Sequence, residues 1–267
     1  MIFKRAIFII LSLIAVNAEA QLIDTLIDVS PYTLHFRILK GKNLPILFES
    51  GGGMDASQWD SIATVLHHRL QATVITYDRA GFGKSTLDTA NYTILQEIKS
   101  LEVALGNFGY GNADFLVVGH SLGGFYNRVF AGRHPEQVKG IVLLDPRIPS
   151  YEDMSFARNY FKSLDRKDYE PDDISLYHLL ANMERNSNYV RQVPLPSEIP
   201  ILNIMAEKGP FTEVQENERF QADQRSFVKA AKNRKLVLAK GSSHNIPYDK
   251  PGLVIELITN FYQKLRN

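Results

Sequence analysis

The sequence predicts an α/β fold in which a mostly parallel sheet is flanked by helices. Short apolar runs rich in β-branched residues recur along the chain, and segments with helical periodicity lie between most of them. Each run is long enough for one buried strand. Because parallel strands need crossover connections, this alternation is typical of a sheet covered on both faces. The predicted strands are 46–48, 72–77, 115–118, 141–144, 201–205 and 235–238.

Length and composition are those of one ordinary globular domain. The chain has 267 residues, of which 45% are apolar and 22% charged, so it can bury one sizeable core and is not expected to be disordered. Composition leaves the oligomeric state open. The 30 basic and 29 acidic residues give a formal net charge of +1, without a basic run. Nucleic acid is therefore not an expected partner, because phosphate backbones are bound by clustered positive charge.

The first twenty residues differ from the rest and predict a signal peptide at 1–20. Residues 1–5 carry two positive charges, residues 6–16 are almost wholly apolar, and Ala18 and Ala20 are small. The apolar run is shorter than the roughly 20 residues that cross a bilayer, which favours cleavage over an uncleaved anchor. We expect an exported protein, periplasmic or secreted, with no membrane span after cleavage. Cysteine is absent, so neither a disulfide nor a lipid-modified cysteine is available.

The remaining chain, 21–267, is expected to form a single domain that starts with an edge hairpin. Residues 22–38 alternate loosely and contain the break Ser30-Pro31, which predicts two antiparallel strands. Apolar residues repeat at spacings of four and three in 94–108 and every four in 253–265. Both segments are therefore predicted to be helices that bury one face.

About fifty residues separate the strands 141–144 and 201–205, and they predict a small helical cap over about 146–199. Long insertions in compact domains are usually functional lids; a partner-binding protrusion is the alternative. The apolar side chains of the predicted cap either line an entrance for substrate or form the core of the cap itself. The second interpretation is favoured. These side chains are Phe156, Tyr160, Phe161, Tyr177 and Leu180.

A candidate nucleophile, Ser121, lies in the run Gly119-His120-Ser121-Leu122-Gly123. The run follows an apolar strand and precedes a helix, so the serine is expected at a tight, strained turn with its hydroxyl above the sheet. Glycine on either side, at 119 and 123, lets neighbouring chain approach without a Cβ clash. The backbone N–H of Leu122, at a helix N-terminus, is a candidate donor to an oxyanion. A merely structural glycine turn is the alternative.

A serine hydroxyl needs a general base, and His244 is the predicted one among seven histidines. It follows the last predicted strand, in a loop expected over the carboxyl ends of the parallel strands. His120 is expected to point away from Ser121 and to make a packing contact or a supporting hydrogen bond. The others are interpreted as solvated or structural: His35, His67, His68, His134 and His178.

These motifs resemble the α/β-hydrolase family, and the resemblance runs from about residue 34 to the C-terminus. Residues 77–85, YDRAGFGKS, resemble the family's strand-to-loop motif at the active-site floor, and Trp59 matches a packing aromatic. Where many members have His-Gly, this chain has Ser50 followed by three glycines. The resemblance implies that the backbone N–H of Gly52 is the second oxyanion donor.

The acid of the triad has two candidates. In the family it usually follows the strand that corresponds to 201–205, where this chain has Glu207, and some members use the position of Asp145. Asp145 is favoured over Glu207 to accept the Nδ1 hydrogen bond of His244; its alternative role is to cap the strand end. Asp78 belongs to the floor motif and is not expected to be catalytic.

The resemblance implies acyl transfer to Ser121 and hydrolysis of a small-molecule ester, with amides, lactones and carbon–carbon bonds as alternatives. Dehalogenases and epoxide hydrolases of this fold have an aspartate where Ser121 stands. No cofactor or metal is expected, because dinucleotide, P-loop and zinc-protease motifs are absent. A protein of this fold that only binds a ligand is the alternative of another class.

Overall fold

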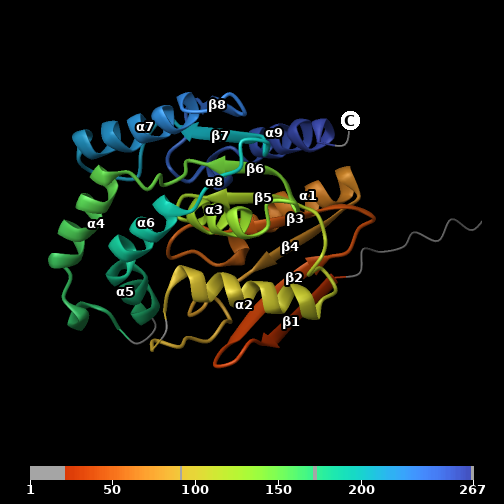
Figure 1. The fold of residues 1–267 in the computed structure, drawn as a ribbon, viewed down its shortest axis with the longest axis horizontal. Helices are drawn as coiled ribbons and strands as arrows, with labels where there is room; N and C mark the ends of the chain where they lie inside the picture. The colour runs from red at the N-terminus through yellow and green to blue at the C-terminus, as the bar shows by residue number, and fades with distance from the viewer. Residues whose placement is uncertain (1–21, 91, 171–172, 266–267) are drawn as a thin grey trace, which may run out of the picture.

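A single sheet with helices on both faces forms the centre of the molecule (Figure 1). The computed structural model describes residues 22–90, 92–170 and 173–265, and the predicted signal peptide lies outside them. Within these residues the sheet has eight strands in the order β1-β2-β4-β3-β5-β6-β7-β8. The strands are β1 (Leu22–Asp28), β2 (Thr33–Leu39), β3 (Asn43–Glu49), β4 (Ala72–Tyr77), β5 (Phe115–His120), β6 (Val138–Leu144), β7 (Ile201–Ala206) and β8 (Arg234–Ala239).

Helices connect most of these strands, so the predicted α/β class is confirmed. Both helices predicted from apolar spacing are present, as α2 and α9. The α-helices are α1 (Asp60–Leu70), α2 (Ile94–Asn107), α3 (Gly123–Arg133), α4 (Tyr151–Lys162), α5 (Ile174–Ala181), α6 (Met183–Gln192), α7 (Val214–Lys229), α8 (Ile246–Asp249) and α9 (Pro251–Lys264). Short 3₁₀ helices of the described residues include η1 (Ala56–Trp59) and η2 (Arg166–Asp168).

The predicted edge hairpin is present, and the rest of the sheet is parallel. β1 pairs with β2, and β2 with β4, in antiparallel register. From β3 through β8 all neighbouring strands are parallel. Parallel pairing brings the carboxyl ends of these strands to one edge of the sheet, and the loops that follow them lie together there.

The chain order reverses at β3, and this reversal opens a crevice. From β3 the chain continues to β4 on one side, and from β4 it crosses to β5 on the other side of β3. The loops after β3 and β5 therefore leave the sheet in opposite directions. In open α/β sheets, ligands bind at such a switch point, outside the carboxyl ends of the strands.

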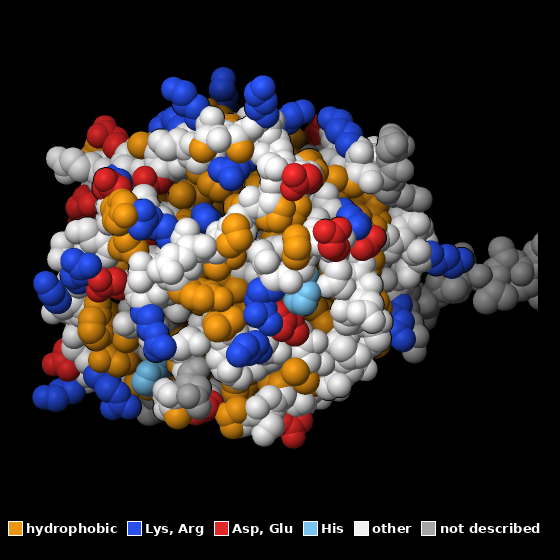
Figure 2. Space-filling view, in the orientation of Figure 1, with side chains coloured by type: hydrophobic (Ala, Val, Ile, Leu, Met, Phe, Trp, Pro, Cys, Tyr) orange, Lys and Arg blue, Asp and Glu red, His pale blue; other side chains and the backbone are white. Residues whose placement is uncertain are grey.

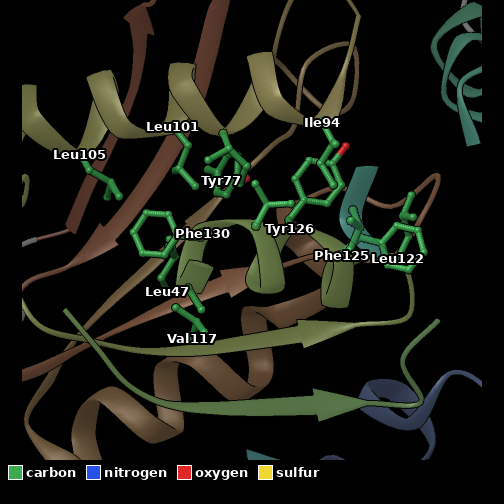
Figure 3. Close-up of a cluster of buried hydrophobic side chains, with 14 of the residues drawn as sticks. Leu47, Tyr77, Ile94, Leu101, Leu105, Val117, Leu122, Phe125, Tyr126 and Phe130 are labelled. Carbon is green, nitrogen blue, oxygen red and sulfur yellow. The ribbon is translucent and has the colours of Figure 1, made fainter. Parts of the chain in front are cut away.

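Apolar side chains of the central strands alternate between two cores. Leu47 of β3 and Val117 of β5 face α2 and α3 (Figure 3). Their neighbours Ile46, Leu116 and Val118 belong to the opposite core, beneath α1 and α9. Because successive side chains of a strand point to opposite faces, strands buried on both sides read as continuous apolar runs. This explains why the runs in the sequence located the strands.

The predicted helical cap follows β6. Helices α4, α5 and α6 lie beyond the carboxyl ends of the parallel strands, at the left of Figure 1. The cap therefore covers the same end of the sheet as the crevice. Among the described residues no helix has the length and apolar character needed to span a bilayer.

Charged side chains of both signs are interspersed over the visible face, in keeping with the net charge of +1 (Figure 2). A row of Lys and Arg follows the edge where Figure 1 places α7, β8 and α9. The edge strand β8 exposes Leu236 and Leu238 and also Lys235. Lysines on an edge strand oppose pairing with the edge of another sheet.

We predict that Trp59→Ala lowers the free energy of unfolding by about 3 to 5 kcal/mol, the usual cost of removing a buried aromatic ring. Trp59 is wholly buried, with its ring centroid 4.8 Å from that of Phe48. Val103, on the exposed side of α2, is the control, and Val103→Ala should change this energy by less than about 0.5 kcal/mol. Urea unfolding followed by circular dichroism measures both. Equal, small effects would contradict the burial of Trp59 against Phe48.

Candidate active site

Ser121 occupies the tight turn between β5 and α3. Its φ is +52°, a left-handed conformation that non-glycine residues rarely adopt. A Cβ at Gly119 would lie 2.5 Å from Asn127 Nδ2, and one at Gly123 would lie 2.5 Å from the carbonyl oxygen of Glu49. Both positions therefore require glycine for the reason expected from the sequence. The Ser121 side chain remains partly exposed at the crevice.

Two backbone N–H groups beside this turn are free. Among the described residues neither the N–H of Leu122 nor that of Gly52 donates to a protein acceptor. The two residues are adjacent, since a Cβ at Gly52 would lie 3.4 Å from Leu122 Cδ2. Unpaired backbone donors next to a serine hydroxyl can accept the charge of a developing oxyanion. The pair predicted from the sequence thus lies on the two sides of the crevice.

His244 lies in the loop between β8 and α8, and its ring is hydrogen-bonded to Asp145. Nδ1 of His244 is 2.6 Å from Oδ2 of Asp145. The carboxylate is wholly buried, and its Oδ1 accepts from the N–H of Ala206 at 3.0 Å and from Gln224 Nε2 at 2.8 Å. A carboxylate on Nδ1 holds the proton there, so Nε2 of the imidazole carries the free lone pair.

Glu207, the other candidate acid, makes a different contact. Its carboxylate accepts the backbone N–H of Gly241 at 2.7 Å, at the start of the loop that carries His244. The third acid near the sheet end, Asp78, bonds His35 Nδ1 at 2.8 Å and also the N–H groups of Ala56 and Lys84. The structure therefore brings Asp145, and neither of the other two, to the imidazole of His244.

His120 makes supporting hydrogen bonds, one of the two roles expected for it from the sequence. The N–H of Gly51 donates to Gln58 Oε1 at 2.9 Å, which leaves the Gln58 amide nitrogen to donate to His120 Nδ1 at 2.8 Å. His120 Nε2–H then donates to the carbonyl of His244 at 2.9 Å, and the two rings are 4.7 Å apart. Burial, together with the nearby His244 and Arg79, lowers the pKa of His120 to about 3, so the ring is neutral.

The other histidines have contacts elsewhere in the fold. His35 lies between Asp24 and Asp78, and His67 bonds the carbonyl of Ala72. His134 bonds Glu102 on α2, and the His178 ring packs against Tyr92. The His68 ring packs against that of its neighbour His67. In the part of the chain that the structure describes, no group of three His, Asp or Glu side chains could hold a metal ion.

A cavity of about 660 Å³ lies between the cap and the loop after β7. Three of the five cap residues singled out in the sequence line it, namely Phe156, Tyr160 and Leu180. The other two, Phe161 and Tyr177, pack against each other with centroids 6.4 Å apart. The favoured interpretation, that these residues form the core of the cap, therefore does not hold for Phe161, which is 39% exposed.

The cavity adjoins the residues described above. Arg147 lines it, and the backbone N–H of Arg147 donates to the carbonyl of Ser121 at 3.1 Å. On the other wall, Phe211 packs against Phe220, whose ring centroid is 5.8 Å from that of His244. Ser121 therefore contacts a residue that lines the cavity, and His244 lies behind Phe220, which packs against another.

Sequence reasoning missed two glutamines of this site, Gln58 and Gln224. Gln58 lies next to Trp59 in η1, and Gln224 lies on α7 facing the sheet. Both are almost wholly buried. A glutamine at an inward position of an amphipathic helix is the only signal that could have found Gln224, because buried polar side chains require partners.

The sequence model of the alpha/beta hydrolase family matches residues 46–257. The chain belongs to this family. The match starts in β3 and ends in α9, so it includes the turn at Ser121, Asp145 and the loop of His244. Membership in this family supports hydrolase activity.

This α/β hydrolase is similar to several known proteins. It is 28% identical over 229 residues to the uncharacterized protein YqjL of Bacillus subtilis, covering 82% of this chain and 84% of YqjL. It is 36% identical over 90 residues to lipase LipV of Mycobacterium tuberculosis, covering 34% of this chain and 32% of LipV. A thermophilic esterase from Thermogutta terrifontis superimposes with a TM-score of 0.62 at 18% identity, over 93% of this hydrolase and all of that chain.

His120→Gln is predicted to remove a pH-dependent part of the stability. The folded pKa of about 3 lies below the ordinary value of 6.5, so the unfolded chain takes up the proton first. The neutral ring's contribution is complete above that ordinary value and is lost as the pH falls toward the folded pKa, by up to about 1.4 kcal/mol per pH unit. Between about pH 7 and about pH 4.5, the free energy of unfolding measured with urea should therefore fall more for wild type than for His120→Gln. Equal losses in the two proteins would contradict it.

Proposed function

We propose that this α/β hydrolase is a serine esterase that acts through Ser121, His244 and Asp145. The observation that carries the proposal is the 2.6 Å contact between His244 Nδ1 and the buried carboxylate of Asp145. This contact leaves Nε2 of the imidazole free to act as a base. The carbonyl of His244 also accepts a hydrogen bond from His120, the residue before Ser121. In the proposal, the Ser121 hydroxyl, this base and the two free N–H donors act together at the crevice.

In the proposed mechanism the Ser121 hydroxyl attacks the ester carbonyl while His244 Nε2 takes its proton. Asp145 stabilises the imidazolium, and the N–H groups of Gly52 and Leu122 bind the oxyanion. The tetrahedral intermediate collapses, the carbon–oxygen bond to the alcohol breaks, and His244 returns the proton to the leaving alcohol. Water then attacks the acyl-enzyme with the same imidazole as base, which releases the acid and restores Ser121.

The cavity beside the cap is the proposed site for one side of the ester. Phe156, Tyr160, Phe211, Leu180 and Met183 make much of its wall apolar. Such a wall favours an apolar acyl or alcohol group by contact and loss of hydration. Two of the similar proteins are a lipase and an esterase, which supports an ester as the bond that is cleaved.

Ser121→Ala is expected to abolish both covalent labelling by a fluorophosphonate probe and hydrolysis of short p-nitrophenyl esters. Loss of a nucleophile lowers turnover by several orders of magnitude, on the order of 10⁶ where it was measured in a serine protease. Ser226→Ala, on the exposed side of α7, is the control and should label as wild type does. A wild-type protein that neither labels nor hydrolyses any ester would instead support a ligand-binding protein of this fold.

Asp145→Asn should reduce kcat by about 10³- to 10⁴-fold, because an amide in place of the carboxylate no longer holds the imidazole in the reactive tautomer. Glu207→Gln, at the rival acid, should keep kcat within about threefold of wild type. Steady-state kinetics with thermal melts of both variants separates a loss of turnover from unfolding. A larger loss in Glu207→Gln, or small losses in both, would refute the assignment of the acid.

A further inference from the structure

Arg79 is a buried cation that takes no part in the proposed mechanism. It follows β4, its side chain is almost wholly buried, and it lies beneath the loop that leaves β3. Removing a guanidinium from water costs several kcal/mol unless hydrogen bonds and opposite charges compensate. Its partners therefore indicate what the side chain does.

The guanidinium donates to two successive backbone carbonyls of that loop. Nη1 donates to the carbonyl of Ser50 and Nη2 to that of Gly51. A planar fork with two donors suits this contact, whereas the single ammonium group of a lysine does not reproduce it. The loop continues through Gly52 and Gly53, which have no side chains to anchor them. Its peptide orientation thus depends on groups that bind its backbone.

Binding the Gly51 carbonyl also orients the Gly52 N–H, since both belong to one peptide unit. That unit is planar and trans, so its C=O and N–H point in opposite directions. With the carbonyl held on Arg79, the N–H points away from Arg79, and it has no acceptor among the described residues. The preceding unit is held in the same way, by Arg79 on the Ser50 carbonyl and by Gln58 on the Gly51 N–H.

Two buried carboxyls lie near Arg79 without taking these donors from the loop. Glu49 Oε2 lies 3.9 Å from Nη1, beyond hydrogen-bond distance, and Glu49 accepts from the Tyr77 hydroxyl instead. Glu97 on α2 accepts from Tyr126, whose ring centroid is 4.7 Å from the guanidinium carbon. Burial raises the pKa of Glu49 to about 8 and that of Glu97 to about 7, against the opposing effect of Arg79.

We infer that Arg79 is a positioning residue that aims the Gly52 N–H at the oxyanion. The inference rests on the proposed esterase mechanism and adds to it the group that orients one of its two donors. Arg79 itself need not touch substrate. Its loss should weaken binding of the transition state and leave binding of the ground-state ester almost unchanged, because the oxyanion forms only on the way to the intermediate.

The test compares Arg79→Lys with Tyr126→Phe. Tyr126→Phe removes the hydroxyl bond to Glu97 but leaves the ring and both bonds from Arg79 to the loop, so it disturbs the same buried cluster. Arg79→Lys should lower kcat by about 10- to 100-fold with KM within about threefold, somewhat less than the about 10²- to 10³-fold cost of deleting a donor. Tyr126→Phe should keep kcat within about twofold even where it lowers the Tm.

A trifluoromethyl ketone supplies a second measurement, since its tetrahedral adduct places an oxyanion in the same position. Its Ki should rise in Arg79→Lys by the same factor as kcat/KM falls, which a general loss of stability would not produce. A folded Arg79→Lys with wild-type kcat and Ki, or an equal loss in Tyr126→Phe, would overturn the inference.

If Arg79→Lys does not fold, Arg79→Met combined with Glu97→Gln removes one cation and one carboxyl together and is compared with Glu97→Gln alone. Wild-type kcat in that double variant would overturn the inference equally. Failure of the proposed function looks different, because wild type itself would then hydrolyse no ester and Ser121 would not react with the phosphonate.

Discussion

The hydrogen bond between His244 Nδ1 and the buried carboxylate of Asp145 is the contact on which the site depends. It joins the loop after β8 to the end of β6, two segments 99 residues apart. A buried carboxylate without partners is strongly destabilising. Here the donors of Ala206, Gln224 and His244 satisfy it. The hydrogen bonds that offset the cost of burying Asp145 therefore also hold the imidazole of His244 in one orientation.

From the same loop a chain of matched hydrogen bonds runs to the other side of the crevice. The carbonyl of His244 accepts from His120, His120 accepts from Gln58, and Gln58 accepts from Gly51. The backbone N–H of Gly51 can only donate and the carbonyl of His244 can only accept. The direction of every hydrogen bond between them, and with it the tautomer of His120, is therefore determined. Arg79 ends the chain by holding the Gly51 carbonyl. The loop after β8 and the loop after β3 are thus coupled through buried polar groups.

Two residues of the site carry backbone strain, and the sheet sustains it. Ser121 and Asp145 have φ values of +52° and +41° at the ends of the neighbouring strands β5 and β6. Each donates its backbone N–H to the next strand, Ser121 to Leu144 at 2.9 Å and Asp145 to Ile204 at 2.7 Å. Strained conformations persist where the surrounding structure over-determines them. Parallel strands with apolar cores on both faces provide that surrounding, and they direct both side chains toward one end of the sheet.

The sequence by itself determined the features that depend on near neighbours along the chain. Apolar runs located the strands, the glycines around Ser121 predicted a sharp turn after β5, and the gap between β6 and β7 predicted the cap. Only the tertiary structure decided the features that depend on distant segments. It chose Asp145 over Glu207 as the partner of His244, and it supplied Gln58 and Gln224. It also placed Phe156 and Tyr160 at the cavity wall and paired Phe161 with Tyr177 outside the cavity lining. The physical reason is that strand periodicity and turn strain act over a few residues, whereas a hydrogen-bond partner is selected by the packing of loops that the sheet brings together.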